Sequence, residues 1–420
     1  MNLKIKNIAL WIFIGLLSLG QFQRIELGPN TSSVNIYFHD IFIFSWLFYL
    51  AIRTKLSFVK KFLKKEVLRK FIKIYKVEFI FFLITFIGVI FNLGLNKDLI
   101  SVLYIMRLVG YLVFAASLKM LTSGEKNKGL DLPKLTNDEQ NQSLSELRFK
   151  FFSAGLIILA LGLLQITLIS DTRFLAIFGW DDHYNRLIST IFDPGFTGII
   201  LIITYFYFLS LRKSIFHMKS LVTGNLLELL MTLVFFWSIA LTYSRASYLS
   251  LLVGLITFAF INKKNTLKYL IASAIFVLMI IITPKPGGEG VNLARTSTID
   301  ARTSTIEYEL KKTKPQTILI GNGLFSAQNS LEKHPFIRSH SRIPDNFLVN
   351  IFLSTGIFGF ILAIILIIKW LIKTIKIDQE LGIAILATLV HSQFNNSMLQ
   401  SFVLLILLGG IASIKTKVKT

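Results

Sequence analysis

Apolar segments of spanning or near-spanning length dominate this chain of 420 residues. A membrane-spanning helix needs about 17 to 25 residues, with allowance for tilt and for ends that reach the interface. Runs of this length therefore predict twelve transmembrane helices. They lie at 8–22, 36–52, 77–95, 99–121, 151–170, 196–211, 226–241, 247–261, 269–283, 347–371, 381–394 and 399–414.

The composition indicates the same class of protein. Hydrophobic residues make up 53% of the chain, only 16% are charged, and the mean hydropathy is +0.64. Soluble domains usually carry about 25% charged residues. We expect an all-α, polytopic integral membrane protein in three parts. Residues 1–283 hold the first nine transmembrane helices with short loops, 284–346 form one large extracytoplasmic loop, and 347–420 hold the last three helices and a cytoplasmic tail.

The positions of lysine and arginine predict the orientation. If both termini are cytoplasmic, about two thirds of the 45 basic residues fall in the inner segments, as the positive-inside rule requires. The net charge of +22 is then mostly a topology signal. A nucleic-acid partner is disfavoured, because the positive charge is spread over every inner segment instead of one face.

Arginine and lysine are distributed differently. Lysine supplies most of the inner charge, whereas eight arginines fall in the outer segments. A guanidinium binds phosphate oxygens in a bidentate manner and is less costly to desolvate than an ammonium, so these arginines indicate a phosphorylated or pyrophosphorylated ligand. Solvated loop charge is the alternative interpretation. The eight are Arg24, Arg173, Arg186, Arg245, Arg295, Arg302, Arg338 and Arg342.

Two short outer segments place individual arginines. The turn 242–245 joins two apolar segments with almost no loop, so Arg245 is held at the outer membrane surface, as a ligand or as a snorkelling anchor. Arg186 precedes Asp193-Pro194-Gly195, which marks the start of a helix with Asp193 as its N-cap. Because a helix N-terminus favours an anion, Arg186 is a candidate phosphate ligand.

The large loop contains a duplication and a polar cluster. Residues 294–300 and 301–307 repeat the pattern Ala-Arg-Thr-Ser-Thr-Ile-acid. In a helix this spacing would put Arg295 and Arg302 on one face about 10 Å apart, suited to an extended anion or simply to solvent. The cluster precedes the next apolar segment and contains the residue types used for proton transfer and oxyanion binding. Its members are His334, Arg338, His340, Arg342, Asp345 and Asn346.

Metal and cofactor chemistry is not expected. The chain has no cysteine, which excludes disulfides and thiolate metal sites. One carboxylate and two histidines in the loop cluster, without clear ligand spacing, favour acid/base work over a metal centre.

Three stretches resemble the O-antigen ligase and polymerase superfamily of bacterial surface-polysaccharide synthesis. The stretch 186–195 is similar to the family's arginine-to-Pro motif, and 241–246 is similar to its Thr-x-Ser-Arg turn. The segments 321–325, 345–348 and 356–359 are similar to its loop exit. The likeness covers roughly 181–359, and the order and placement of the motifs carry it more than any one of them.

The resemblance implies a glycosyltransferase that uses a glycan carried on undecaprenyl pyrophosphate, at the outer face of the bacterial cytoplasmic membrane. Arg186, Arg245 and either Arg295 or Arg302 would bind the pyrophosphate, with Arg338 and Arg342 as further candidates. Asp345 or His340 would deprotonate the acceptor hydroxyl, and Asn346 would contact the acceptor or an oxyanion. A flippase and a chain-length regulator would be partners, besides the lipid-linked oligosaccharide and the bilayer.

One departure from the family pattern bears on the acceptor. Ligases of this superfamily tend to carry His-Asn where this chain has Asp345-Asn346. We therefore expect a polymerase of O antigen, capsule or exopolysaccharide repeat units. Transfer of glycan to lipid A core, as in a ligase, is the first alternative. A lipid-linked sugar transporter or flippase is the second, although Arg107 is the only basic residue more than two positions from the end of a predicted span.

Overall fold

The computed structural model describes residues 3–27, 34–54, 75–96, 99–123, 136–212, 223–313, 315–325 and 344–415. These residues are mostly α-helical, with short 3-10 turns and one two-stranded antiparallel sheet. The helices are α1 (Leu3–Ser18), α2 (Phe38–Arg53), α5 (Lys76–Asn96), α6 (Leu99–Ser123), α7 (Asn137–Leu168), α8 (Pro194–Leu211), α9 (Thr223–Ala240), α10 (Arg245–Ile261), α11 (Thr266–Ile282), α12 (Ser297–Lys312), α13 (Pro315–Ile320), α14 (Phe347–Ile377), α15 (Gln379–Asn395) and α16 (Ser401–Ala412).

The smaller elements occupy the connections between helices. Strands β1 (Arg24–Leu27) and β2 (Val34–Tyr37) pair between α1 and α2. The 3-10 turns in the described residues are η1 (Gly20–Gln23), η2 (Arg173–Phe178), η3 (Ser189–Ile191), η4 (Lys263–Asn265), η5 (Glu289–Val291) and η7 (Ser397–Leu399).

Each predicted apolar segment overlaps one helix: α1, α2, α5 to α11 and α14 to α16. The chain is thus an all-α membrane protein. Within the described ranges, five helical stretches are long and apolar enough to cross a membrane: Ser101–Thr122, Asp138–Leu168, Pro194–Leu211, Lys263–Ile282 and Phe347–Ile377. Membrane crossing by the other predicted segments, and the total of twelve, stay predictions.

One helix is longer than its apolar run. The apolar segment begins at 151, but α7 begins at Asn137. Thr136 accepts a hydrogen bond from the backbone N–H of Glu139, and the Glu139 carboxylate accepts one from the N–H of Thr136. This capping box satisfies two backbone donors and starts the helix in polar sequence, which a hydrophobicity pattern does not register.

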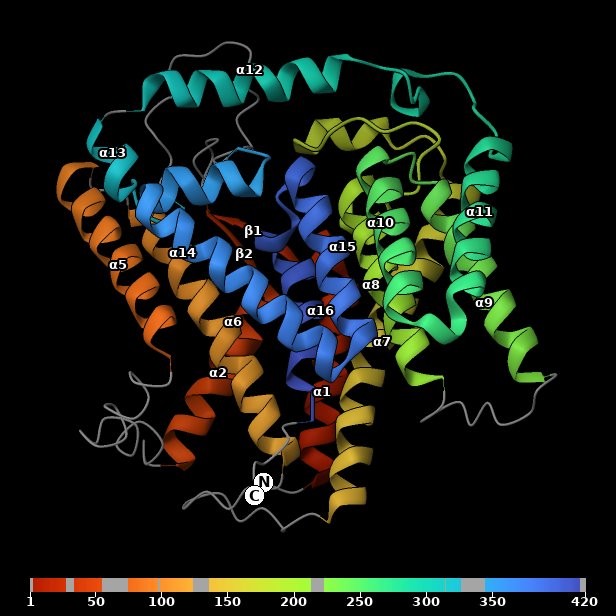
Figure 1. Cartoon of the computed structure of the whole chain (residues 1–420), viewed down its shortest axis with the longest axis horizontal. Helices are drawn as coiled ribbons and strands as arrows, with labels where there is room; N and C mark the ends of the chain where they lie inside the picture. The colour runs from red at the N-terminus through yellow and green to blue at the C-terminus, as the bar shows by residue number, and fades with distance from the viewer. Residues whose placement is uncertain are drawn as a thin grey trace.

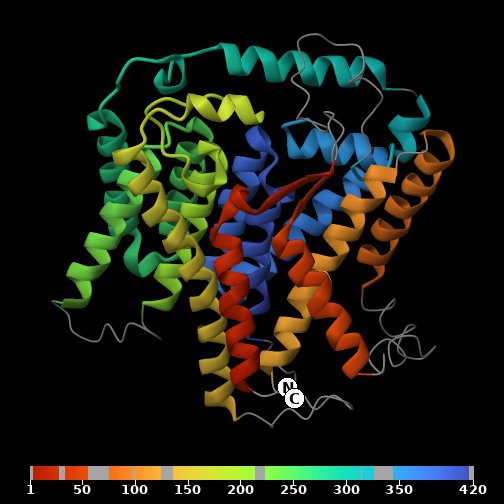
Figure 2. The same ribbon diagram turned by 180° about the vertical axis from the view of Figure 1, so that it is seen from behind.

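Helix α8 is the centre of the bundle. The span Pro194–Leu211 is 89% buried, whereas the span Lys263–Ile282, which comprises η4 and α11, is 17% buried. Helices α7, α9, α10, α15 and α16 pack around α8 (Figures 1 and 2). The exposed side chains of the outer helices are largely apolar, as expected for helices surrounded by lipid.

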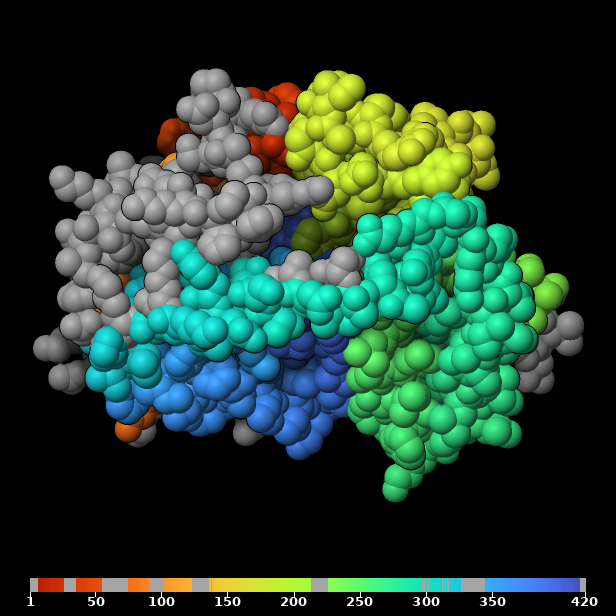
Figure 3. Space-filling model, turned by 90° about the horizontal axis from the view of Figure 1, so that it is seen from above, coloured from red at the N-terminus to blue at the C-terminus, as the bar shows by residue number. Residues whose placement is uncertain are grey.

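The described residues of the segment 284–346 lie across one end of the bundle. Its described residues hold η5, α12 and α13, and α12 runs over the helix ends while α1 begins at the opposite end (Figure 1). Seen from above, α12 crosses this face with a recess between it and residues 170–195 (Figure 3). That this end is extracytoplasmic stays a prediction.

The two copies of the repeat differ in structure. Arg302 is in α12, but Arg295 precedes the helix, which begins at Ser297. The Asn292 side chain accepts a hydrogen bond from the N–H of Ala294 at 2.9 Å, a local bond that competes with helical pairing. The spacing expected for two arginines on one helix face is therefore absent.

A kink in α14 joins that helix to the loop. Gly356 has φ +64 and ψ −174 inside the helix, and a Cβ there would lie 2.3 Å from the carbonyl oxygen of Leu319 in α13. The N–H groups of Asn322 and Gly323 donate to the carbonyls of Leu353 and Ser354, just before the kink. The kink therefore leaves helix carbonyls free to bind the residues that directly follow α13.

Replacing Gly356 with alanine should destabilise the protein. The left-handed backbone and the clash with Leu319 are expected to cost about 1–3 kcal/mol. Thermal unfolding of purified protein in lipid nanodiscs measures the effect. Gly15→Ala, where no atom lies within 4 Å of the added Cβ, is the matched control. Equal melting temperatures for Gly356→Ala and wild type would contradict the strain argument.

Candidate functional site

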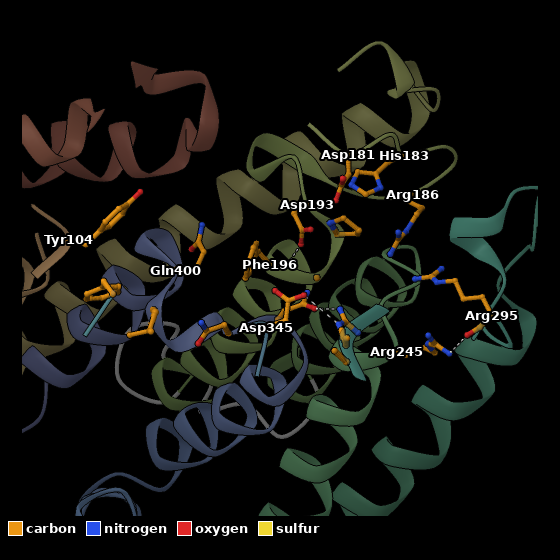
Figure 4. Close-up of a pocket in the computed structure, with 18 residues that line it drawn as sticks. Tyr104, Asp181, His183, Arg186, Asp193, Phe196, Arg245, Arg295, Asp345 and Gln400 are labelled. Atoms are coloured by element: carbon orange, nitrogen blue, oxygen red, sulfur yellow. Dashed lines mark hydrogen bonds and ion pairs between the residues drawn. The ribbon is translucent and has the colours of Figure 1, made fainter. Parts of the chain in front are cut away.

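A cavity of ≈ 500 Å³ lies beside the 170–195 segment and α12 (Figures 3 and 4). Its walls come from segments distant in sequence, and they include four of the arginines singled out above together with Asp345. The lining residues are Tyr104, Asp181, His183, Arg186, Asp193, Pro194, Gly195, Phe196, Arg245, Ala246, Arg295, Arg302, Phe325, Asp345, Asn395, Asn396, Leu399 and Gln400.

Arg186 is held by the backbone of the turn between α9 and α10. Its Nε donates to the carbonyl of Thr242 at 3.0 Å and its Nη2 to that of Tyr243 at 3.4 Å. Only 7% of the residue is exposed. Burial, and then the charge of Arg295, lower the pKa of Arg186 to about 10. The guanidinium is therefore still charged at neutral pH.

The turn itself has the tight geometry that the sequence predicted. Helix α9 ends at Ala240 and α10 begins at Arg245, with Tyr243 in the left-handed region at φ 50. Ser244 caps α10 by accepting from the N–H of Ser247. Arg245 donates to the carbonyls of Leu293 at 3.2 Å and Arg295 at 2.7 Å. One turn thus orients two arginines.

Arg295 completes a group of three guanidinium ions at this end of the cavity. Its Nη1 donates to the carbonyls of Glu289 and Gly290. Burial, and then the charge of Arg245, lower its pKa. Its Nε is buried and has no hydrogen-bond partner among the described residues. Because Arg295 lowers the pKa of Arg186 and Arg245 lowers that of Arg295, the charges disfavour one another, and the group is suited to an anion that would neutralise them.

Arg302 lies beside Asp345, one of the two predicted catalytic residues. Its Nη2 donates to the Asn395 side-chain oxygen at 2.6 Å, and its Nε lies 3.7 Å from a carboxylate oxygen of Asp345. The Asp345 side chain is 51% exposed. The carboxylate therefore reaches the cavity on the same side as an arginine from α12.

The N-terminus of α8 opens into the same cavity. Asp193 accepts a hydrogen bond from the N–H of Phe196 at 2.7 Å, which confirms its predicted function as N-cap, and Pro194 occupies the first turn. A Cβ on Gly195 would lie 2.0 Å from the Asn395 side-chain nitrogen. The glycine thus makes room for the side chain that accepts from Arg302.

The remaining predicted site residues are of two kinds. His334, Arg338, His340 and Arg342 fall within 326–343, outside the described residues. Asn346 does not line the cavity: its oxygen caps α14 by accepting from the N–H of Val349, and its nitrogen donates to the carbonyl of Gln393. A substrate contact by Asn346 stays a prediction.

Sequence reasoning did not single out His183, Asn395 and Asn396. Asn395-Asn396 directly ends an apolar helix, and an Asn in that position is a common left-handed C-cap, so the pair carried a detectable signal. His183 follows two aspartates in an ordinary polar loop, and this pattern carries no signal of a functional site. Within the described part of the chain, no three His, Asp or Glu side chains gather as metal ligands would.

The non-glycine residues with positive φ in the described chain also gather in the segments that form the cavity. They are Asn185, Ser189, Phe192, Tyr243, Phe325 and Asn396. Left-handed conformations at Phe, Tyr and Ser are costly and are retained where the surrounding structure requires them, often at functional sites.

One comparison with known proteins finds a match between part of this chain and a protein family. Residues 230–364 match the family model described as O-antigen ligase. This stretch contains Arg245, Arg295, Arg302 and Asp345, so most of the predicted site falls within it, while Arg186 precedes it. No curated protein and no solved structure matches the chain.

Gly195→Ala should impair substrate binding with little loss of stability. The added Cβ would push the Asn395 side chain from its place and break its bond to Arg302. We expect weaker binding of the substrate and a nearly unchanged melting temperature. Gly287→Ala, in open space in the loop before η5, is the control. Undiminished binding by Gly195→Ala would show that the bond between Asn395 and Arg302 is dispensable.

Proposed function

We propose that this chain is a polymerase of surface polysaccharide, and the match of residues 230–364 to the family model described as O-antigen ligase supports the proposal. Its donor is a repeat unit linked to undecaprenyl pyrophosphate, and its acceptor is the glycan of a second such molecule. It acts on the outer face of the bacterial cytoplasmic membrane, with a flippase and a chain-length regulator as partners. The observation that carries the proposal is the convergence of four arginines and Asp345 on one cavity.

The arginines suit the leaving group. When the anomeric C–O bond breaks, the bond electrons and a negative charge pass to the pyrophosphate. Arg186, Arg245 and Arg295 offer fixed positive charge because backbone carbonyls hold their side chains before the ligand arrives. Preorganised charge of this kind stabilises a developing anion without reorganisation during the reaction.

Asp345 suits the nucleophile. In the proposed step its carboxylate takes the proton from an acceptor hydroxyl, and the hydroxyl oxygen forms the new bond to the anomeric carbon. Undecaprenyl pyrophosphate departs with the electron pair of the broken bond. Arg302, whose Nε lies 3.7 Å from the carboxylate, orients it. His340 is the alternative base.

A ligase is the second candidate, favoured by the description of the matching family itself. It would use the same donor chemistry and differ in the acceptor. The Asp345-Asn346 pair, in place of the His-Asn of ligases, favours the polymerase. The transport alternative rests on Arg107, which is ion-paired with Asp40 at 2.9 Å.

Arg245→Ala should abolish polymer formation in the producing bacterium. Loss of one group that stabilises the leaving charge typically lowers the rate about 10² to 10³-fold. Surface glycan from a deletion strain complemented with each variant is resolved on a gel. Arg173→Ala is the control, since this exposed arginine pairs with Asp171 and does not line the cavity.

The gel also separates the candidate functions. Single repeat units on their normal acceptor in the deletion strain indicate a polymerase. Long chains stranded on the lipid carrier indicate a ligase. Unchanged glycan, in the deletion strain or with Arg245→Ala, would overturn the proposed role of the arginines.

Asp345→Asn should lower kcat about 10² to 10⁴-fold and change KM little, because the amide keeps the shape of the carboxylate but cannot accept the proton. Turnover of lipid-linked repeat units extracted from the deletion strain measures both constants. Asp300→Asn, the same substitution at an exposed position in α12, is the control. A normal kcat for Asp345→Asn would assign the base elsewhere, with His340 the next to replace.

A further inference from the structure

The cavity has a second end with no arginine among its lining residues, although Arg107 lies over the Tyr104 ring at 5.3 Å from its centroid. In Figure 4, Tyr104 and Gln400 lie on the side away from Arg245 and Arg295, and Asp345 lies between the two groups. The rings of Tyr104 and Phe325 stack with centroids 5.7 Å apart. This end is therefore built from aromatic and amide groups, which suit an uncharged polar ligand better than a phosphate.

Asn396 has an unused hydrogen-bonding atom at the cavity wall. The residue is only 7% exposed and lines the cavity. Its Nδ2 donates to the carbonyl of Pro344 at 3.3 Å, and its Oδ1 is buried with no partner among the described residues. Buried polar atoms are nearly always paired, so an unpaired oxygen in a residue that lines a cavity is an acceptor that a ligand could complete.

The chemistry of the missing partner follows from the orientation of the amide. A carbonyl can only accept, so the atom facing Pro344 must be the nitrogen and the remaining atom must be the oxygen. An amide oxygen is an acceptor and requires a donor. Phosphate and pyrophosphate oxygens at neutral pH supply none, whereas every hydroxyl of a sugar ring does.

The backbone at Asn396 is fixed in place. The residue ends α15 with φ 51 and its N–H donates to the carbonyl of Ser392. Buried His391 bonds Ser397 in the next turn at 2.5 Å and Ser247 of α10 at 3.2 Å. The turn that carries Asn396 is thereby tied to the helix that begins with Arg245, which preorganises the amide before a ligand arrives.

We propose that Asn396 binds a hydroxyl group of the acceptor sugar, and that the Tyr104, Phe325 and Gln400 end of the cavity holds this ring. The inference rests on the proposed function, because it divides one active site between a pyrophosphate end and a sugar end. Pro344, whose carbonyl fixes the Asn396 amide, directly precedes Asp345. The bound ring is thereby brought next to the group that takes its proton.

Asn396→Gly tests the proposal with little backbone strain, because glycine adopts φ 51 readily and the substitution removes only the side chain. The control is Asn185→Gly, the same substitution at φ 54 in a residue that does not line the cavity. The full-length protein in nanodiscs is titrated with two probes. One is the repeat-unit oligosaccharide released from the carrier lipid of the deletion strain, and the other is farnesyl pyrophosphate.

We expect Asn396→Gly to weaken oligosaccharide binding about tenfold, the usual effect of losing one hydrogen bond in a buried site. Binding of farnesyl pyrophosphate should be unchanged, and wild type and Asn185→Gly should bind both probes equally well. The proposal is overturned if wild type does not bind the oligosaccharide or if Asn396→Gly binds it normally. Displacement of the oligosaccharide by farnesyl pyrophosphate would also overturn it, since the sugar would then lie at the arginine end.

Failure of the proposed function gives a different result. In that case farnesyl pyrophosphate does not bind wild type, or binds Arg245→Ala as tightly, while the oligosaccharide still depends on Asn396. Such a result supports a sugar-hydroxyl site at Asn396 and removes the pyrophosphate assignment.

Discussion

The site depends on the hydrogen bonds that the turn between α9 and α10 makes to arginine. The carbonyls of Thr242 and Tyr243 hold Arg186, and Arg245 donates to the carbonyls of Leu293 and Arg295. Main-chain dipoles therefore orient guanidinium groups whose charges repel one another. Three segments far apart in sequence are fastened together in this way, and the positive charge they bring together remains directed at a cavity.

The membrane bundle supplies the rigidity that this arrangement requires. Helix α8, buried almost entirely, begins at the cavity wall with Asp193 and Pro194. Helix α15 packs against α8, α10 and α14, and its end presents Asn395 and Asn396. Since helix ends in a bundle cannot move independently, polar groups on short connections keep fixed positions relative to one another.

The cavity separates two kinds of chemistry along its length. Arginines at one end suit a diphosphate, and amide and aromatic groups at the other suit a sugar. Asp345 lies between them, beside Arg302. This order suits the proposed glycosyl transfer, because the bond that breaks joins sugar to phosphate and the carboxylate that takes the acceptor's proton lies between the two ends.

Much of this could be predicted from sequence, for a physical reason. In lipid, each spanning segment must satisfy its backbone hydrogen bonds within its own helix, so apolar runs reveal helices without knowledge of their neighbours. Each of the twelve runs, from 8–22 to 399–414, overlaps one helix. The turn at Arg245 and the cap at Asp193 are likewise local. Tertiary structure alone brought His183 and Asn396 to the cavity and left Asn346 out of its lining, because those outcomes depend on contacts between segments distant in sequence.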